Sequence, residues 1–296
     1  MKLNQAYSRK IFVFVPLLAV LFAALGVWGA GAILSLPAAR KIENLPGGFA
    51  VEPVAFASQS GATLRGWFIP GQPGAGIVIL MHGYRGDRSQ MAGRVPFLVQ
   101  AEYGVLLFDF QAHGESVGKQ ITLGYLESLD AQAAVAFIKE RYPAEKVGVV
   151  GLSLGGAAAV LATPPLPIDA LILEMVYPDI HRATANRLAR YMGNWARPFT
   201  PLLTWQLKPR LGIDENALRP IARVSVLPVP KLFIAGEKDR HTPLSESAEL
   251  FAAAQAPKEF WVVPGAPHGD AHQMMASEYE QRVLAFLAKH LRRLRR

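Results

Sequence analysis

Short apolar segments that alternate with longer helical patterns constrain the fold of this chain more than any other feature. Four of them have the length of a strand and are apolar almost throughout: residues 76–81 (GIVILM), 104–110 (GVLLFDF), 146–152 (KVGVVGL) and 170–176 (ALILEMV). Continuous apolar runs of this length are typical of strands buried on both faces of a parallel sheet. The segments between them have helical patterns, at residues 89–103, 123–142 and 154–162. This alternation predicts an α/β fold, in which helices flank a mainly parallel sheet.

The same alternation extends from residue 51 to the C-terminal region, so we expect residues 51–296 to form one domain. Further elements are predicted at its two ends, with strands at residues 51–58, 63–70, 231–237 and 259–263 and helices at 245–254 and 277–291. The pattern breaks at residues 178–230, which we expect to form a helical cap inserted into the domain. Residues 37–50 are rich in Pro and Gly and are predicted to be a linker.

The segment before this linker has the composition of a membrane span. Residues 11–36 carry no charge, and at about 1.5 Å per residue such a helix exceeds the roughly 30 Å hydrocarbon core of a bilayer. Residues 1–10 carry three basic residues and no acid, so the positive-inside rule predicts a cytoplasmic N-terminus and a periplasmic or extracellular domain. The alternative is a cleaved signal peptide, with small-residue sites at 30–32 and 37–39, and a secreted domain. The uninterrupted length favours an uncleaved transmembrane signal anchor.

The net charge of +8 belongs to the two ends of the chain. Eight basic residues lie in residues 1–10 and 287–296, with no acid beside them: Lys2, Arg9, Lys10, Lys289, Arg292, Arg293, Arg295 and Arg296. The other 23 basic residues are balanced by 23 acidic ones. Nucleic-acid-binding proteins carry their basic excess on the folded domain, so we expect no nucleic-acid partner. The chain has no cysteine, which excludes a disulfide scaffold, a thiolate zinc site and a cysteine nucleophile.

A serine stands at the turn from a predicted strand to a predicted helix. Residues 151–155 read Gly-Leu-Ser-Leu-Gly, and the helix that follows is rich in Ala and Gly. In a G-x-S-x-G motif at such a turn, the sharp bend lifts the serine hydroxyl above the end of the sheet, and the glycines allow the helix to pack closely. The dipole of that helix favours a developing negative charge at its N-terminus. Ser153 is therefore the candidate nucleophile.

A serine nucleophile needs a base and an acid that orients the base. His268 follows the predicted strand 259–263, and Asp239 follows the predicted strand 231–237. Catalytic groups gather at the carboxyl ends of parallel strands, and the order Ser153, Asp239, His268 is the order typical of this design. His272 is the alternative base, although we expect it on the following helix, and Asp179 is the alternative acid.

Two backbone amides are predicted to stabilise the oxyanion. One is the amide of Leu154, next after the serine, and the other is the amide of Tyr84, in the loop after the strand 76–81. Three polar residues could suggest a metal site: Asp109, His113 and His82. We expect the two histidines to stabilise their loops, and we predict no metal and no organic cofactor.

Together these motifs resemble those of serine hydrolases with the α/β-hydrolase fold, in particular the lipase-, esterase- and aminopeptidase-like group. The resemblance includes the His82-Gly83 loop and a D-x-x-x-H-G-x-S turn at residues 109–116, and it covers residues 51–291. The turn departs from the family at Gln111 and Ala112, where relatives often have Arg and Gly.

The resemblance implies a membrane-anchored serine hydrolase that works through an acyl-enzyme formed by a Ser-His-Asp triad. The substrate class it favours is a small-molecule or lipid-like carboxylic ester. A serine peptidase or amidase of the same fold is the alternative, and a catalytically silent, membrane-tethered interaction module is a third reading.

The predicted cap has its own pattern. Leu188, Tyr191, Met192 and Trp195 recur at helical spacing and predict one apolar face, with Arg190 and Arg197 opposite it. In one reading this face covers an acyl or aromatic pocket, so that Tyr191, Met192 and Trp195 contact substrate and the cationic surface lies near lipid headgroups. In the other reading the cap is an ordinary amphipathic element with a solvated face.

Overall fold

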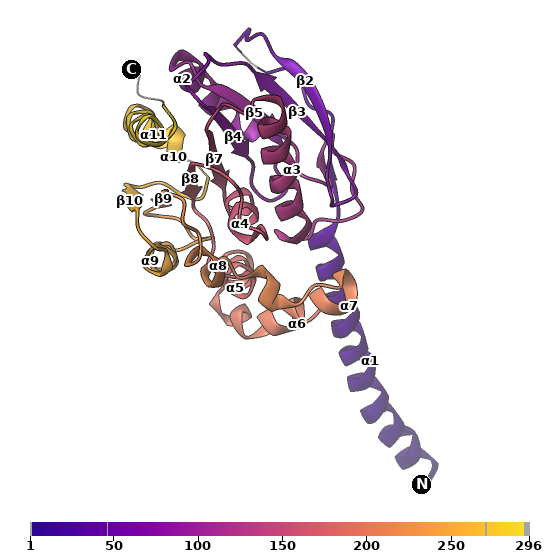
Figure 1. Cartoon of the computed structure of the whole chain (residues 1–296). Coiled ribbons are helices and arrows are strands. Elements are labelled where there is room, and N and C mark those ends of the chain that lie inside the picture. The colour runs from indigo at the N-terminus through magenta and orange to yellow at the C-terminus, as the bar shows by residue number, and fades with distance from the viewer. Residues whose placement is uncertain (1, 46, 270, 293–296) are drawn as a thin grey trace.

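A computed structural model describes residues 2–45, 47–269 and 271–292, with the backbone alone for residues 2–16 and 23 (Figure 1). Its centre is a sheet of eight strands: β2 (Glu52–Ala57), β3 (Thr63–Ile69), β4 (Ile77–Met81), β5 (Gly104–Phe108), β7 (Val147–Leu152), β8 (Ala170–Glu174), β9 (Lys231–Gly236) and β10 (Lys258–Val263). The strand order is β10-β9-β8-β7-β4-β5-β3-β2. The pairs β2–β3 and β3–β5 are antiparallel, and the other neighbours are parallel. The predicted mainly parallel α/β sheet is confirmed.

Helices cover both faces of the sheet. One face is covered by α3 (Tyr125–Arg141), α4 (Leu154–Leu161) and α9 (Leu244–Ala253), which share an apolar cluster with the strands. The other face is covered by η1 (Arg88–Arg94), α2 (Val95–Gln100) and α11 (Ala276–Leu291), with the short α10 (Ala271–Met274) before α11. The sheet is therefore buried on both sides, which explains why its central strands are apolar throughout.

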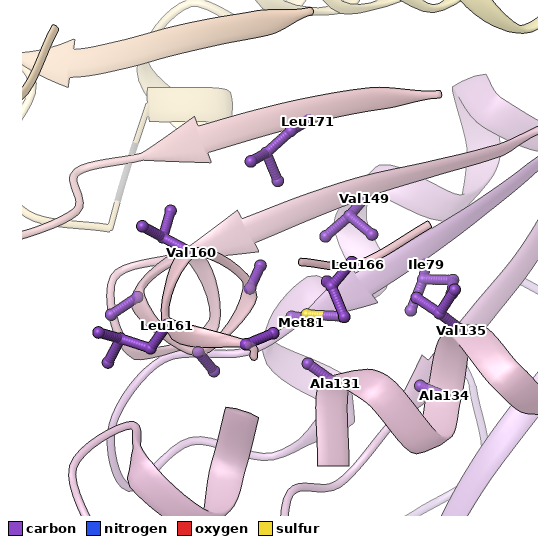
Figure 2. Packing of buried hydrophobic residues seen from close by; sticks show 14 of the residues in the cluster. Ile79, Met81, Ala131, Ala134, Val135, Val149, Val160, Leu161, Leu166 and Leu171 are labelled. Carbon is purple, nitrogen blue, oxygen red and sulfur yellow. The ribbon is translucent and has the colours of Figure 1, made fainter. Parts of the chain in front are cut away.

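The alternation of side chains along each strand divides the core into two layers. In β4, Ile79 and Met81 point to the layer of α3 and α4, whereas Val78 and Leu80 point to the layer of α2 and α11. Figure 2 shows side chains of the first layer: Ile79, Met81, Val149, Leu171, Ala131, Ala134, Val135, Val160 and Leu161. Burial of each large apolar side chain stabilises the fold by about 1.5–3 kcal/mol.

The N-terminal helix, α1 (Lys2–Ser35), extends away from the body of the protein beside the helices of the cap (Figure 1). Its stretch Leu17–Ser35 has a mean hydropathy of 2.3 and is long and apolar enough to cross a bilayer. After α1 the chain forms β1 (Ala38–Ala39), which pairs in parallel with β6 (His113–Gly114). The segment predicted to be a linker thus begins with residues that are hydrogen-bonded to the domain.

The segment between β8 and β9 is helical, and we call residues 178–230 the cap. Its elements are α5 (Ile180–Met192), η2 (Asn194–Phe199), α6 (Thr200–Thr204), α7 (Leu207–Leu211), η3 (Glu215–Leu218) and α8 (Pro220–Val224). Gly193, with φ of 96°, ends α5. The prediction of one helical face from Leu188 to Trp195 is therefore wrong, because a glycine in this conformation stops the helix and puts Trp195 on η2.

Candidate active site

The chain turns sharply at Ser153, between the end of β7 and the start of α4. Its φ of 50° and ψ of −107° lie in a region that non-glycine residues rarely adopt. Two backbone hydrogen bonds hold this conformation: Ser153 N donates to Glu174 O at 2.8 Å, and Ala157 N donates to Ser153 O at 2.9 Å. The serine side chain thus stands on a strained but firmly held backbone above the end of the sheet.

Glycines around this turn allow the close packing that it requires. A Cβ on Gly155 would overlap the carbonyl oxygen of Met81 at the end of β4. A Cβ on Gly156 would overlap the side chain of Val176 and the carbonyl oxygen of Gly151. The first turn of α4 therefore lies directly against the sheet. This packing fixes the positions of the backbone N–H groups that have no acceptor within the helix.

Asp239 and His268 meet at the carboxyl ends of two neighbouring strands, β9 and β10. His268 Nδ1 donates to Asp239 Oδ2 at 2.7 Å, and the Asp239 side chain has no exposed surface. The other carboxylate oxygen of Asp239 accepts hydrogen bonds from the backbone N–H groups of His241, at 2.7 Å, and Thr242, at 2.9 Å. The carboxylate is thus held in place on both oxygens, and an Nδ1–H of His268 leaves Nε2 able to accept a proton.

Met175, directly after β8, connects the loops that carry Asp239 and His268. Its φ is 52°, and its Sδ accepts a hydrogen bond from Gly269 N at 2.9 Å. Its carbonyl oxygen accepts from Thr242 Oγ1 at 3.2 Å. No motif in the sequence marks Met175, because its contacts arise only when three strand ends come together.

The two alternative residues are engaged elsewhere. Asp179 caps the N-terminus of α5, where it accepts a hydrogen bond from Arg182 N at 2.8 Å and forms an ion pair with the Arg182 side chain. His272 lies on α10, as expected, and its Nε2 is 3.0 Å from Glu280 Oε1. The carboxylate that reaches His268 is that of Asp239.

Both predicted oxyanion residues, Leu154 and Tyr84, line the same cavity as Ser153. Leu154 is the first residue of α4, where helix geometry leaves the N–H without an intrahelical acceptor. In the loop after β4, Gly83 N donates to Gln90 Oε1 at 2.8 Å and Arg85 N donates to His113 Nε2 at 3.2 Å. Within the described residues, the Tyr84 amide between them has no protein acceptor. Both amides are therefore available to a ligand.

His82 and His113 hold the backbone of these loops. His82 Nε2 accepts a hydrogen bond from Phe110 N at 3.1 Å, and its Nδ1 lies 2.8 Å from Gly83 O. Burial lowers the pKa of the His82 imidazole well below its usual value, so this side chain stays neutral. Across the described residues, no group of three His, Asp or Glu side chains is arranged to hold a metal ion.

A buried ion pair supports the backbone beneath Ser153. Arg94 Nε donates to Glu174 Oε1 at 3.1 Å and to the Tyr279 hydroxyl at 2.9 Å, and all three residues are buried. Burial alone would lower the pKa of Arg94, but the Glu174 carboxylate raises it above its usual value, so Arg94 stays charged. Since Glu174 O accepts the hydrogen bond from Ser153 N, this network positions the turn.

Ser153 and His268 line one cavity of about 620 Å³. Its wall also includes the predicted oxyanion residues Tyr84 and Leu154, and the cap residues Leu188, Tyr191 and Met192. Of the three predicted cap contacts, Tyr191 and Met192 therefore lie at the cavity, whereas Trp195 lies on the outer surface, where its ring packs against Phe199. A further wall, which the sequence did not predict, consists of Ala30, Ile33 and Leu34 of α1.

A second histidine, His241, lies next to His268 in this cavity. The two ring centroids are 5.0 Å apart. Burial, followed by the nearby His268, lowers the pKa of His241 to about 4. His241 is therefore neutral at neutral pH, and it adds no positive charge beside His268.

The sequence and the fold of this chain are similar to those of known proteins. The sequence profile described as alpha/beta hydrolase family matches residues 78–284. Protein YfhR of Escherichia coli O157:H7 is 27% identical over 259 residues, which cover 83% of this chain and 84% of the relative. Protein Rv2307c of Mycobacterium tuberculosis (strain H37Rv) is 31% identical over 239 residues, or 79% and 76% of the two chains. Among solved structures, an esterase of Pyrococcus furiosus, Pf2001, has a TM-score of 0.72 and 25% identity, covering 87% of this chain and 98% of the other.

Proposed function

Since the chain belongs to the alpha/beta hydrolase family, we propose that it is a serine hydrolase that cleaves carboxylic esters through Ser153, His268 and Asp239. The observation that carries the proposal is the hydrogen bond from His268 to a fully buried Asp239 beside the cavity that also holds Ser153. This pairing of a base and an orienting acid is what an otherwise weak serine nucleophile requires.

In the proposed reaction, Ser153 Oγ attacks the carbonyl carbon of the ester while His268 Nε2 takes the hydroxyl proton. The buried carboxylate of Asp239 stabilises the imidazolium that forms and keeps the ring in orientation. The amides of Leu154 and Tyr84 donate to the oxyanion, and each such donor is typically worth about 2.7–4 kcal/mol of transition-state stabilisation. His268 then protonates the leaving alcohol, and water, activated by the same imidazole, hydrolyses the acyl-enzyme.

Two observations favour an ester over an amide or peptide. The cavity beside Ser153 is lined largely by apolar side chains, which suit an acyl chain better than a peptide backbone that must be hydrogen-bonded. In addition, the solved structure from Pyrococcus furiosus described above is that of an esterase.

The proposal includes a membrane location. Residues 11–36 would act as an uncleaved anchor, with the N-terminus in the cytoplasm and the catalytic domain outside it. The support is the apolar stretch Leu17–Ser35 of α1 together with the basic residues that precede it in the sequence. A reporter protein fused after Arg40 should be active outside the cytoplasm, and a reporter active only inside it would contradict this topology.

The catalytic proposal is tested by labelling the full chain in detergent micelles with a fluorophosphonate probe, which reacts with activated serines. We expect the wild type and the control Ser277→Ala, changed at an exposed serine of α11, to label equally, and Ser153→Ala to remain unlabelled. Equal labelling of Ser153→Ala would show that another residue reacts and would overturn the assignment. Turnover of nitrophenyl esters against nitroanilides of the same acyl group then separates esterase from amidase activity.

A further inference from the structure

The C-terminal turns of α1 are built into the candidate active site. Ile33 and Leu34 line the cavity that holds Ser153. The Tyr84 hydroxyl donates to Leu34 O at 2.6 Å, and the Arg85 side chain donates to Ile33 O at 3.4 Å. The backbone amide of Tyr84 is one of the two predicted oxyanion donors, and Arg85 follows it in the same loop. The helix is therefore attached directly to the loop that would bind the substrate carbonyl.

The cap holds the same helix from a second side. Gln206 Nε2 donates to Val27 O at 3.0 Å, and the Arg210 guanidinium lies 4.2 Å from the centroid of the Trp28 ring. Gly31 faces the Gln206 side chain so closely that a Cβ there would overlap it. Because these contacts hold the helix from Val27 onward, they fix the position along α1 at which the domain begins.

The length of α1 then places the cap at the membrane. A bilayer core of roughly 30 Å needs about 20 residues, so a span that begins at Ile11, after the basic residues, ends near Ala30. The cap already contacts the helix at Val27 and Trp28. Any tilt shortens the rise of the helix and brings the domain closer to the lipid. The cap must therefore lie at the boundary between hydrocarbon and headgroups.

The cap has the surface that this position requires. Six large apolar side chains on α5, η2, α6 and directly after α6 are 48–74% exposed, and we call them the cap patch: Tyr191, Met192, Trp195, Phe199, Leu202 and Trp205. The patch continues to α1, because the rings of Trp205 and Trp28 are 6.4 Å apart. An exposed apolar patch rich in Trp and Tyr is typical of a surface at a membrane interface.

Charge at the cap favours the same partner. Residues 190–210 contain four basic residues and no acid: Arg190, Arg197, Lys208 and Arg210. Cations beside an apolar patch bind the anionic headgroups of lipids, each contributing about 1 kcal/mol near such a surface. A soluble protein partner would also have to avoid the bilayer that α1 holds next to this patch.

From these observations we infer that the cap patch docks on the bilayer that α1 spans, and that the cavity takes an acyl lipid directly from this bilayer with α1 as one of its walls. The substrate part of this inference rests on the proposed esterase function, whereas the docking part rests only on the proposed membrane anchor. An acyl chain could pass beside Ile33 from the hydrocarbon core to Ser153 without crossing water, which avoids the free-energy cost of hydrating it.

Docking is tested without reference to activity, by quenching of tryptophan fluorescence in vesicles of brominated phosphatidylcholine and phosphatidylglycerol, with bromine close to the headgroup. The full chain has five tryptophans. We expect Trp195→Phe and Trp205→Phe each to lose part of the quenching, and the control Trp261→Phe, whose residue is 6% exposed, to lose none. If Trp195→Phe and Trp205→Phe lose no more than Trp261→Phe, the cap patch does not meet lipid and the inference is overturned.

The wall formed by α1 is tested by comparing Ile33→Trp with Leu25→Trp, both in the full chain reconstituted in vesicles. Leu25 is exposed on the same helix, outside the cavity, so it controls for the added indole. We expect Ile33→Trp to lower kcat/KM for a long-chain nitrophenyl ester about tenfold more than for nitrophenyl butyrate, because the indole fills part of the cavity and excludes the longer chain. Leu25→Trp should keep the ratio of the wild type.

An unchanged ratio in Ile33→Trp, with wild-type turnover of both esters, would overturn the part played by α1. Absence of ester turnover in the wild type would instead count against the proposed function. The quenching experiment measures docking whether or not the protein hydrolyses esters. Failure of the docking inference can therefore be distinguished from failure of the proposed function.

Discussion

The carboxyl edge of the sheet and the surface made by the cap and α1 face the same cavity but are built in opposite ways. At the sheet edge, Asp239 is fully buried, both its oxygens accept hydrogen bonds, and Ser153 is held in a strained conformation by its neighbours. On the cap, Tyr191 and Trp205 are 74% and 67% exposed. The proposed reacting groups are thus positioned by the protein alone, whereas in our proposal the bilayer completes the surface that meets substrate.

The largest effect should come from breaking the sheet edge. Asp239→Asn removes the carboxylate that orients His268, and we expect kcat for ester hydrolysis to fall by about 10⁴-fold. The matched control is Asp179→Asn, which changes an acid that only caps α5 and pairs with Arg182. Steady-state kinetics of the two variants checks this, and near-normal turnover of Asp239→Asn would move the orienting role to another residue.

The same glycine-to-alanine substitution, made once in each region, should show how differently the two regions tolerate an added methyl group. Gly155→Ala puts a Cβ onto the Met81 carbonyl, whereas Gly26→Ala on α1 places it where nothing lies within 4 Å. We expect Gly155→Ala to lower the free energy of unfolding by about 1–3 kcal/mol and to impair Ser153, while Gly26→Ala stays close to the wild type. Thermal unfolding in micelles, with fluorophosphonate labelling, measures both. Equal stability of the two variants would contradict the packing argument.

The contact between the cap and α1, both in the second region, should contribute less to stability. Arg210→Ala removes the cation–π contact with Trp28, and we expect a loss of about 1 kcal/mol, or a fall in Tm of roughly 2–4 °C. Arg190→Ala serves as control because that side chain is exposed on α5. Differential scanning fluorimetry of the two variants in the same detergent is the measurement. A larger fall in Arg190→Ala would mean that the cap is held in another way.

The last prediction concerns the pH dependence of stability. Because the pKa of His241 is lowered to about 4 in the folded protein, the unfolded chain binds a proton more readily between pH 6.5 and 4. His241 therefore makes the wild type less stable as the pH falls through this window, and its contribution is unchanged above it. His241→Gln removes the effect, so its Tm should fall less than that of the wild type between pH 7.5 and pH 5. Parallel decreases in the two proteins would contradict the lowered pKa.

Much of the fold follows from local patterns. Continuous apolar segments predicted β4, β5, β7 and β8 to within two residues, because a strand buried on both faces leaves no room for polar side chains. The interruption after β8 likewise predicted the position of the cap. The helical face of Leu188 to Trp195 was predicted wrongly, since spacing alone does not reveal that Gly193 adopts a positive φ and ends α5.

The candidate site divides in the same way. Ser153 and its glycines, and the order in which Asp239 and His268 follow the last strands, can be read from the chain because each depends on a local turn or on the end of a strand. The pattern favours Asp239 but leaves Asp179 as an alternative, since both acids follow a strand of the same sheet. The structure distinguishes the two acids by the 2.7 Å hydrogen bond from His268 to Asp239, which requires β9 and β10 to be neighbours.

The chain sequence alone was sufficient for the class of fold, the strand-to-helix turn at Ser153 and the apolar N-terminal helix, because these depend on residue spacing and composition over short stretches. Tertiary folding was needed for Met175 to connect two loops and for Ile33 and Leu34 to line the cavity of Ser153. More than one hundred residues separate α1 from Ser153. No local preference connects segments so far apart, and the contact forms only because sheet, cap and helix pack together.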